Sequence, residues 1–313
     1  MYQNATNDVV GDSDARDRAA SCLDEPQSRY AAALTMGRGA VNAIRVVRMS
    51  PDVAARLTAA PPDAGRVHSV FERALNVAWH DGRLLTLQGP GRLLAPFAAA
   101  LTRLPRSDAV RPGFRVWRRG DTLALDGLLI DWRGAATAET AMPESAAGPG
   151  RALSRLLARP PAGCGPGLSS ATGRRAQSRL AAGLSHRDPE AFLDGALGLV
   201  GLGEGLTPAG DDCLVGALAV VHRFARSWLH ANPEIGACVA RTSAAATTDL
   251  AREFVAHALA GHFADSLIDL MTAESVDGVR RAATRLLDSG ATSGADTLCG
   301  IRLALAALDA SRP

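Results

Sequence analysis

The sequence predicts an α+β protein in which a small β-barrel or sandwich precedes an all-α domain. Short apolar runs separated by Asp-Gly and Gly-Asp turn signals lie between residues 29 and 133, and such runs are typical of antiparallel strands. From residue 151 onward, apolar residues recur at i, i+3 and i+4, as in Val279, Ala282 and Ala283, which indicates amphipathic helices. The length of 313 residues also favours about two domains.

Four segments follow from this pattern. Residues 1–28 are polar and predict a flexible tail. Residues 29–133 form the expected β-rich domain. Residues 134–150 are small, contain Pro and Gly and have no period, so we expect a linker there. Residues 151–313 form the expected helical domain, which carries a glycine-rich motif.

Two groups of short strands are expected in the β-rich domain. The first surrounds the turn at Asp81-Gly82, and the second includes turns at Gly120-Asp121 and Asp126-Gly127. Between the two groups, residues 93–104 predict one short helix. The expected helices of the C-terminal domain are Arg151–Arg159, Arg174–Leu184, Pro189–Val200, Pro208–Leu229, one or two within Pro233–Ala260, His262–Met271, Val276–Asp288 and Ala295–Leu308.

Composition excludes several classes of function. All 34 basic residues are Arg, so lysine-based phosphate binding, Schiff-base chemistry and pyridoxal phosphate are excluded. A net charge of +2 and 4% aromatic residues argue against a nucleic-acid partner. The five scattered cysteines, the polar N-terminus and the absence of a long apolar run predict a cytoplasmic protein without a membrane partner.

The most informative stretch runs from Gly198 to Val221. It contains five glycines within thirteen positions, and such a backbone can approach a ligand closely. Thr207 and Pro208 predict a helix start, with Thr207 as N-cap and Pro208 at the first helical position. Asp211 and Asp212 would then lie in the first turn of the helix.

The core of this stretch occurs twice. Gly210–Gly216 and Gly294–Gly300 both read G-x-D-x-L-x-G, each follows a threonine (Thr207, Thr292), and each leads into an Ala/Leu-rich helix. We interpret them as the N-termini of two helices that share one repeated sequence pattern and face each other across a site. The alternative is a chance match in a chain rich in Ala, Gly and Leu.

The stretch Gly201–Gly216, GLGEGLTPAGDDCLVG, resembles the signature of a bacterial family catalogued as a domain of unknown function, which includes the third subunit of oxamate carbamoyltransferase from allantoin catabolism, a purine degradation route. His68–Phe71 and Thr292–Asp296 resemble further parts of that family. The resemblance implies carbamoyl transfer between a carbamoyl phosphate-type donor and an oxamate-like amide. It also implies partner subunits in a hetero-oligomer, with a homo-oligomer as the alternative. Glu204 replaces the usual proline of the family.

Helix N-termini bind anions without lysine, so we expect a phosphate or carboxylate, as the small anionic substrate, over the N–H groups near Gly203–Thr207. The alternative is a glycine-rich turn that only allows close helix packing. The expected substrate- and anion-binding residues are Gly201, Gly203, Gly205, Leu206, Thr207, Gly210, Asp211, Thr292, Ser293 and Gly294.

Asp212 and Asp296 are the expected catalytic residues. A carboxylate beside an anion repels it unless a magnesium ion bridges them, so magnesium is a possible cofactor with Asp212 as its ligand. Adjacent helix positions point about 100° apart, so only one of Asp211 and Asp212 is expected to be a ligand. Alternatively, the carboxylates accept hydrogen bonds from a substrate amide, and Asp211 only stabilises the helix dipole.

Two other functions remain open at this stage. The scarcity of general-base and nucleophile residues around the motif favours a non-catalytic anion-binding or scaffold subunit. The paired Asp motifs also fit a magnesium-dependent hydrolase. Thr247 and Thr248 either line the site or cap a helix, and His257 and His262 either transfer protons or are ordinary packed histidines.

Overall fold

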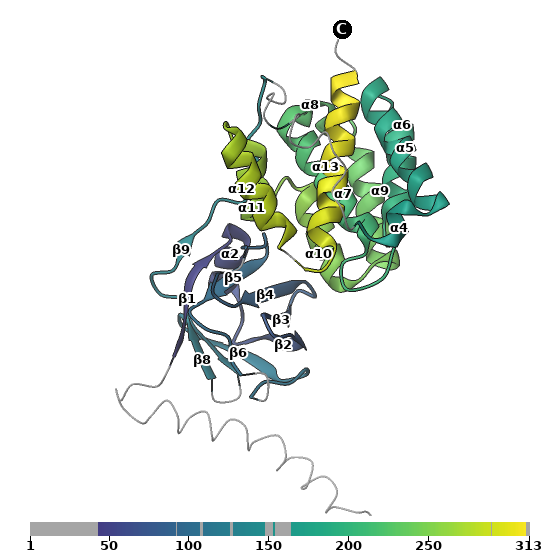
Figure 1. Cartoon of the computed structure of the whole chain (residues 1–313). Coiled ribbons are helices and arrows are strands. Elements are labelled where there is room, and N and C mark those ends of the chain that lie inside the picture. Colours follow the sequence, from purple (N-terminus) through teal and green to yellow (C-terminus); the bar gives the residue numbers. More distant parts are fainter. Residues whose placement is uncertain are drawn as a thin grey trace, which may run out of the picture.

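A computed structural model confirms the predicted α+β class: a β-barrel is followed by an all-helical region (Figure 1). The predicted tail over residues 1–28 and the predicted helix over 151–159 lie outside the described residues, except for Leu153. The domain boundaries stay a prediction. The structure describes residues 43–91, 93–106, 109–125, 128–147, 153, 164–288 and 290–310.

The sheet closes into a barrel of eight strands, because β1 pairs with β5 as well as with β8. Its order around the barrel is β5-β4-β3-β2-β6-β7-β8-β1, and β9 (Ala136–Thr137), within the expected linker, adds beside β1. The helix α2 (Pro51–Ala59) joins β1 to β2, and the Ser50 hydroxyl accepts from the Val53 N–H at its start. The strands are β1 (Ile44–Met49), β2 (Asp63–Val70), β3 (Ala74–Trp79), β4 (Leu84–Gln88), β5 (Ala98–Leu101), β6 (Arg115–Arg119), β7 (Thr122–Leu125) and β8 (Leu128–Asp131).

The predicted hairpins are confirmed in their strand pairing, since β3–β4, β6–β7 and β7–β8 are antiparallel pairs. The Asp126-Gly127 turn itself lies outside the described residues. In β2, the register against β3 shifts between Val67 and Ser69, which makes a β-bulge at His68. A bulge changes the direction in which neighbouring side chains point.

The short helix predicted for residues 93–104 is wrong. Ala98–Leu101 is instead the strand β5, which pairs with β4 on one side and with β1 on the other. Alanine favours a helix locally. Here the barrel closes only through this strand, and the hydrogen bonds of both neighbours outweigh that preference.

The helical region follows the predicted order. The predicted helix Pro208–Leu229 is divided at Ala225, and a short helix not predicted from the sequence begins at Pro166. Pro233–Ala260 forms two helices, one of the two arrangements expected. The helices are α4 (Pro166–Ser169), α5 (Ala171–His186), α6 (Pro189–Leu199), α7 (Ala209–Phe224), α8 (Arg226–His230), α9 (Pro233–Ala246), α10 (Asp249–Leu259), α11 (Asp265–Thr272), α12 (Val276–Leu287) and α13 (Ser293–Ala310).

The helix α7 lies at the centre of the helical core and is buried without interruption from Ala209 to His222. It packs along α13, and the two repeated motifs meet in this contact (Figure 1). A methyl group on Gly216 would overlap the Thr297 carbonyl, and one on Gly300 would overlap the Cys213 carbonyl. Because Cys213 and Thr297 occupy the same position in the two motifs, the contact is symmetrical, and each motif needs glycine for it.

The barrel meets the helical region mainly through β4 and α10. The buried Glu253 accepts hydrogen bonds from the Leu84 N–H, at 3.1 Å, and from Arg83, at 3.0 Å. Phe97 packs edge-on against Phe254, with ring centroids 4.8 Å apart. A second tie is the ion pair between Arg48 and Asp265. These contacts hold the two regions together around the cavity described next.

Candidate functional site

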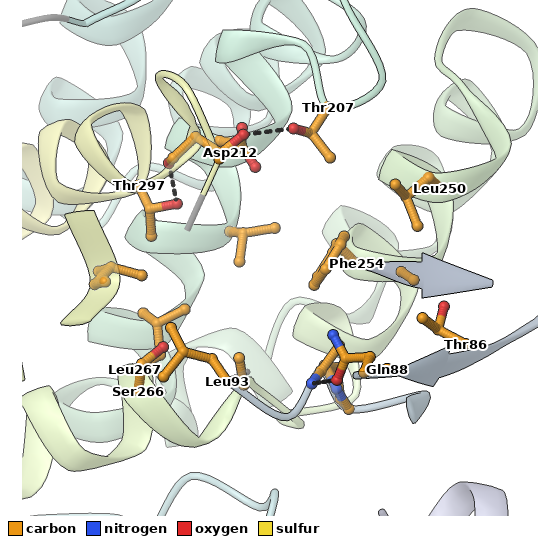
Figure 2. A pocket seen from close by; sticks show the side chains of 18 of the residues that line it. Thr86, Gln88, Leu93, Thr207, Asp212, Leu250, Phe254, Ser266, Leu267 and Thr297 are labelled. Atoms are coloured by element: carbon orange, nitrogen blue, oxygen red, sulfur yellow. Dashed lines mark hydrogen bonds between the residues drawn. The ribbon is translucent and has the colours of Figure 1, made fainter. Parts of the chain in front are cut away.

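A cavity of about 460 Å³ lies between the barrel and the helices (Figure 2). Ligand sites in proteins are typically of this size and often lie between structural units. Most of the lining is apolar, including Phe97 from the barrel and Phe254 from α10. Two groups of polar side chains matter below: Asn76, Thr86 and Gln88 from the barrel, and Thr207, Asp212 and Ser293 from the N-terminal ends of α7 and α13. The other polar and charged residues of the lining are Arg73, His262, Ser266, Arg285, Asp288 and Thr297.

Asp212 is the acidic residue at the α7 end of the cavity. It is 8% exposed, and its Oδ2 has no hydrogen-bond partner among the described residues. Burial raises the pKa of Asp212 well above its ordinary value, while hydrogen bonds from the Ser293 and Thr207 hydroxyls lower it. A buried carboxyl oxygen without a partner is costly. Asp212 is therefore suited to a ligand that brings a hydrogen-bond partner.

Thr207 and Ser293 join the two motifs at the edge of the cavity. Their hydroxyl oxygens are 2.6 Å apart, and Thr297 in turn donates to the Ser293 carbonyl at 2.8 Å (Figure 2). The expectation that Thr207 caps α7 is wrong, because Pro208 is the N-cap and offers no side-chain bond. The Thr207 hydroxyl bonds to the Ser293 hydroxyl of α13 instead, so the N-terminal ends of the two helices are in contact with each other.

The glycine-rich loop leads into α7 with several backbone N–H groups unused. Gly201, Gly203 and Gly205 all have positive φ angles, of 70°, 118° and 96°. Within the described part of the chain, none of the N–H groups from Gly203 to Thr207 donates a hydrogen bond. Leu206 and Thr207 line the cavity, whereas Gly203 and Gly205 lie in the exposed part of the loop.

Asp211 points away from the cavity and holds the loop. Its carboxylate accepts from the Gly201 N–H at 3.1 Å and from the Thr247 hydroxyl at 2.6 Å, and the residue is 1% exposed. Burial raises the pKa of Asp211, and the bonds from Thr247 and Gly201 lower it. The Thr248 hydroxyl caps α10 and also donates to the Leu206 carbonyl.

The counterpart Asp296 is fully buried and does not line the cavity. Its Oδ1 accepts from the Gly165 N–H, at 2.7 Å, at the start of α4. Burial raises the pKa of Asp296, and hydrogen bonds from Gly165 and Thr292 lower it. Gly210 and Gly294 lie against the carbonyls of preceding helices, where a methyl group would clash.

Comparison with protein families agrees with this picture. The family described as oxamate carbamoyltransferase subunit AllH matches residues 199–305, and the AllH family N-terminal domain matches residues 44–138. This chain belongs to the AllH family. The first match spans the helical residues that form the α7 and α13 side of the cavity, and the second spans the barrel. No curated protein and no solved structure gives a significant match to the chain.

The family assignment does not identify a metal or a membrane contact. The described residues hold no group of three or more His, Cys, Asp or Glu side chains placed to bind a metal ion, so magnesium at Asp212 stays a prediction. Within the same ranges, no helix is long and apolar enough to cross a membrane.

The two histidines singled out from the sequence lie at the junction of barrel and helices. Burial lowers the pKa of His257 to about 4, and its ring stacks on Phe97. His262 contacts the Thr140 hydroxyl at 3.0 Å and lines the cavity.

The barrel side of the site was not predicted. Asn76 and Thr86 are 3% and 4% exposed and line the cavity together with Gln88. The available signal was a polar residue inside an apolar strand, in ALNVAW and LLTLQ. Because a buried polar group needs a partner, such residues mark either a structural bond or a site.

Proposed function

We propose that this chain is a carbamoyltransferase subunit and that its cavity binds a carbamoyl phosphate-type donor and an oxamate-like amide. The proposal is supported by the AllH family assignment together with the buried, unpartnered Asp212 oxygen in a cavity of ligand size. Both proposed substrates carry a primary amide and a negative charge, so the site needs one group that binds N–H and another that binds an anion.

The anion would bind at the entry to α7. The N–H groups from Gly203 to Thr207 donate no hydrogen bond to a described residue, and they precede a helix N-terminus. Such groups stabilise a phosphate or carboxylate without a cationic side chain. Their nearest part, Leu206–Thr207, borders the cavity.

Asp212 would bind the amide that is carbamoylated. The nitrogen of this amide attacks the carbonyl carbon of carbamoyl phosphate and forms a C–N bond. The bond between that carbon and the phosphate oxygen breaks, and phosphate leaves with the electron pair. The nitrogen must lose a proton, and the ionised Asp212 carboxylate would accept it. Because burial raises the pKa of Asp212, it accepts a proton more readily than an exposed carboxylate. The phosphate charge that develops would be stabilised by the loop N–H groups.

The test is a transfer assay on the chain purified alone and together with the products of its neighbouring genes. We expect transfer from carbamoyl phosphate to oxamate in a complex, and a loss of about 100-fold or more in kcat with Asp212→Asn. Asp194→Asn is the control, because this exposed carboxylate of α6 lies outside the cavity and pairs only with Arg179 among the described residues. An absence of transfer in every combination of chains rejects the proposal.

A non-catalytic anion-binding subunit is the second candidate. It is favoured by Asp211, Gly210 and Gly294, whose contacts lie within the helical region and outside the cavity. Asp296 also lies outside the cavity, where its Oδ1 accepts from the Gly165 N–H. Thermal-shift measurements with carbamoyl phosphate and oxamate separate the two candidates. Stabilisation that survives Asp212→Asn, without transfer in any complex, supports the second.

The family description as a subunit supports a hetero-oligomeric enzyme. We propose that the assembly is cytoplasmic and serves purine degradation. Measuring the size of the chain co-expressed with its genomic neighbours tests the hetero-oligomer. A chain that binds no partner in any combination contradicts it.

A further inference from the structure

A line of hydrogen bonds runs from the surface of the molecule to the barrel side of the cavity. Asp249 Oδ2 lies 3.1 Å from His68 Nε2, and His68 Nδ1 lies 3.1 Å from Ser69 Oγ. Asn76 donates from Nδ2 to Ser69 Oγ at 3.0 Å and accepts from Thr86 Oγ1 at 2.7 Å. His68 and Ser69 are sequence neighbours on β2, and the bulge at His68 lets both side chains join one line.

All donors in this line point the same way. A carboxylate can only accept, so His68 Nε2 carries the hydrogen that it donates to Asp249, and in this tautomer Nδ1 accepts from the Ser69 hydroxyl. Ser69 then accepts from Asn76, whose carbonyl oxygen accepts from Thr86. The single hydroxyl hydrogen of Thr86 is therefore used. Only its oxygen lone pairs are left for the cavity, where Thr86 can accept but not donate.

Gln88, on the same strand as Thr86, offers a hydrogen-bond donor to the cavity. Its Oε1 accepts from the Ala95 N–H at 3.3 Å, whereas its Nε2 has no partner among the residues described. Residues two apart on a strand share a face and lie about 7 Å apart. The face of β4 that lines the cavity thus offers an acceptor, Thr86, beside a donor, Gln88 (Figure 2).

We infer that Thr86 and Gln88 determine specificity by reading a primary amide of the ligand: Thr86 Oγ accepts from its N–H, and Gln88 Nε2 donates to its carbonyl. Asn76 is a positioning residue, because it fixes the Thr86 hydroxyl. This amide-reading face lies across the cavity from Asp212 and Thr207 (Figure 2). The inference rests on the proposed function, because it takes the cavity as the substrate site. It adds the side chains that distinguish the NH₂ group of carbamoyl phosphate and oxamate from the corresponding ester or acyl group.

The test compares ligand pairs that differ only at the amide. Carbamoyl phosphate is paired with acetyl phosphate, and oxamate with monomethyl oxalate, in calorimetric titrations of the full chain with any partner subunits it needs. A site built around an N–H group rejects an analogue that lacks it. We expect the wild type to bind at least one amide about 10-fold or more tighter than its pair.

Thr86→Val should remove this preference by weakening the amide about 10-fold, with the paired compound changed by less than about 2-fold, and Thr86→Ser should restore it. Gln88→Glu is a second variant that keeps the acceptor for Ala95 but removes the donor, and it should also reduce the preference. Thr58→Val, at an exposed helix position of the barrel region outside the cavity, is the control.

Equal weakening of both members of a pair by Thr86→Val and by Gln88→Glu, or no change with either variant, overturns the inference. Failure of the wild type to bind any of the four compounds overturns it together with the ligands of the proposed function. The protein could show an amide preference that depends on Thr86 and yet have no transfer activity. That result supports the amide-reading face and rejects only the proposed transferase activity.

Discussion

The two copies of the G-x-D-x-L-x-G motif are alike in packing and different in chemistry. The last glycines of the motifs, Gly216 and Gly300, play equivalent parts in the α7–α13 contact. Each aspartate has one carboxyl oxygen, Oδ2, without a hydrogen-bond partner among the described residues. Asp212 lines the cavity, whereas Asp296 is fully buried away from it and accepts from the Gly165 N–H. Sequence similarity between the copies therefore reflects the helix contact. The difference between their surroundings assigns the candidate chemistry to Asp212.

Gly300→Ala tests the feature that the two motifs share, the close contact between α7 and α13, and has the largest expected effect. The added methyl group would overlap the Cys213 carbonyl of α7, so we expect a loss of about 3 kcal/mol in unfolding free energy, or failure to fold. Urea denaturation measures the loss. Gly236→Ala in α9 is the control, because no atom lies within 4 Å of its new methyl group, and it should not destabilise. Equal stability of the two variants would contradict the packing role.

Asp296→Ala tests the structural role of the second copy. It leaves the buried Gly165 N–H without its acceptor, and we expect a loss of about 2 kcal/mol in unfolding free energy. Asp296→Asn keeps an oxygen at that position and should lose less. Ligand affinity should stay within about 2-fold of the wild type for any variant that folds. A large loss of affinity with unchanged stability would place Asp296 in the site after all.

Asp212→Asn tests the opposite role through pH. The folded-state pKa of Asp212 is raised, so the folded protein binds more protons than the unfolded chain, and stability falls as pH rises from about 4 through the folded-state pKa. The asparagine of the variant does not titrate, so the variant does not lose this stability as pH rises. We expect it to be more stable than the wild type by about 1 kcal/mol at pH 8, with the difference vanishing toward pH 3. Urea denaturation across this pH range measures it, and a pH-independent difference would show that Asp212 does not titrate as inferred.

The smallest expected effect concerns Glu204, in the exposed loop beside the unused N–H groups. A carboxylate there repels an incoming anion, so Glu204→Gln should tighten carbamoyl phosphate binding about 2-fold at low salt. The gain should disappear at 1 M salt. Calorimetric titration at both salt concentrations measures it. A weaker affinity in the variant would show that Glu204 contacts the ligand directly.

The barrel strands and most helix positions were predictable because they depend on local signals. Asp-Gly and Gly-Asp turns gave the hairpins, and apolar spacing gave helices such as α12. The strand β5 was not predictable in this way. Its residues favour a helix locally, and only pairing with β4 and β1 makes them a strand.

For the site, the sequence by itself determined the two motifs and the entry of a helix behind a glycine-rich loop. Only the tertiary structure decided which carboxylate faces the cavity, since Asp211, Asp212 and Asp296 have similar local sequences but different neighbours. It also brought Thr86 and Gln88 opposite α7, across more than 100 residues of chain. Local patterns fix backbone geometry. The direction of a buried side chain and its partner across the fold depend on packing between distant segments.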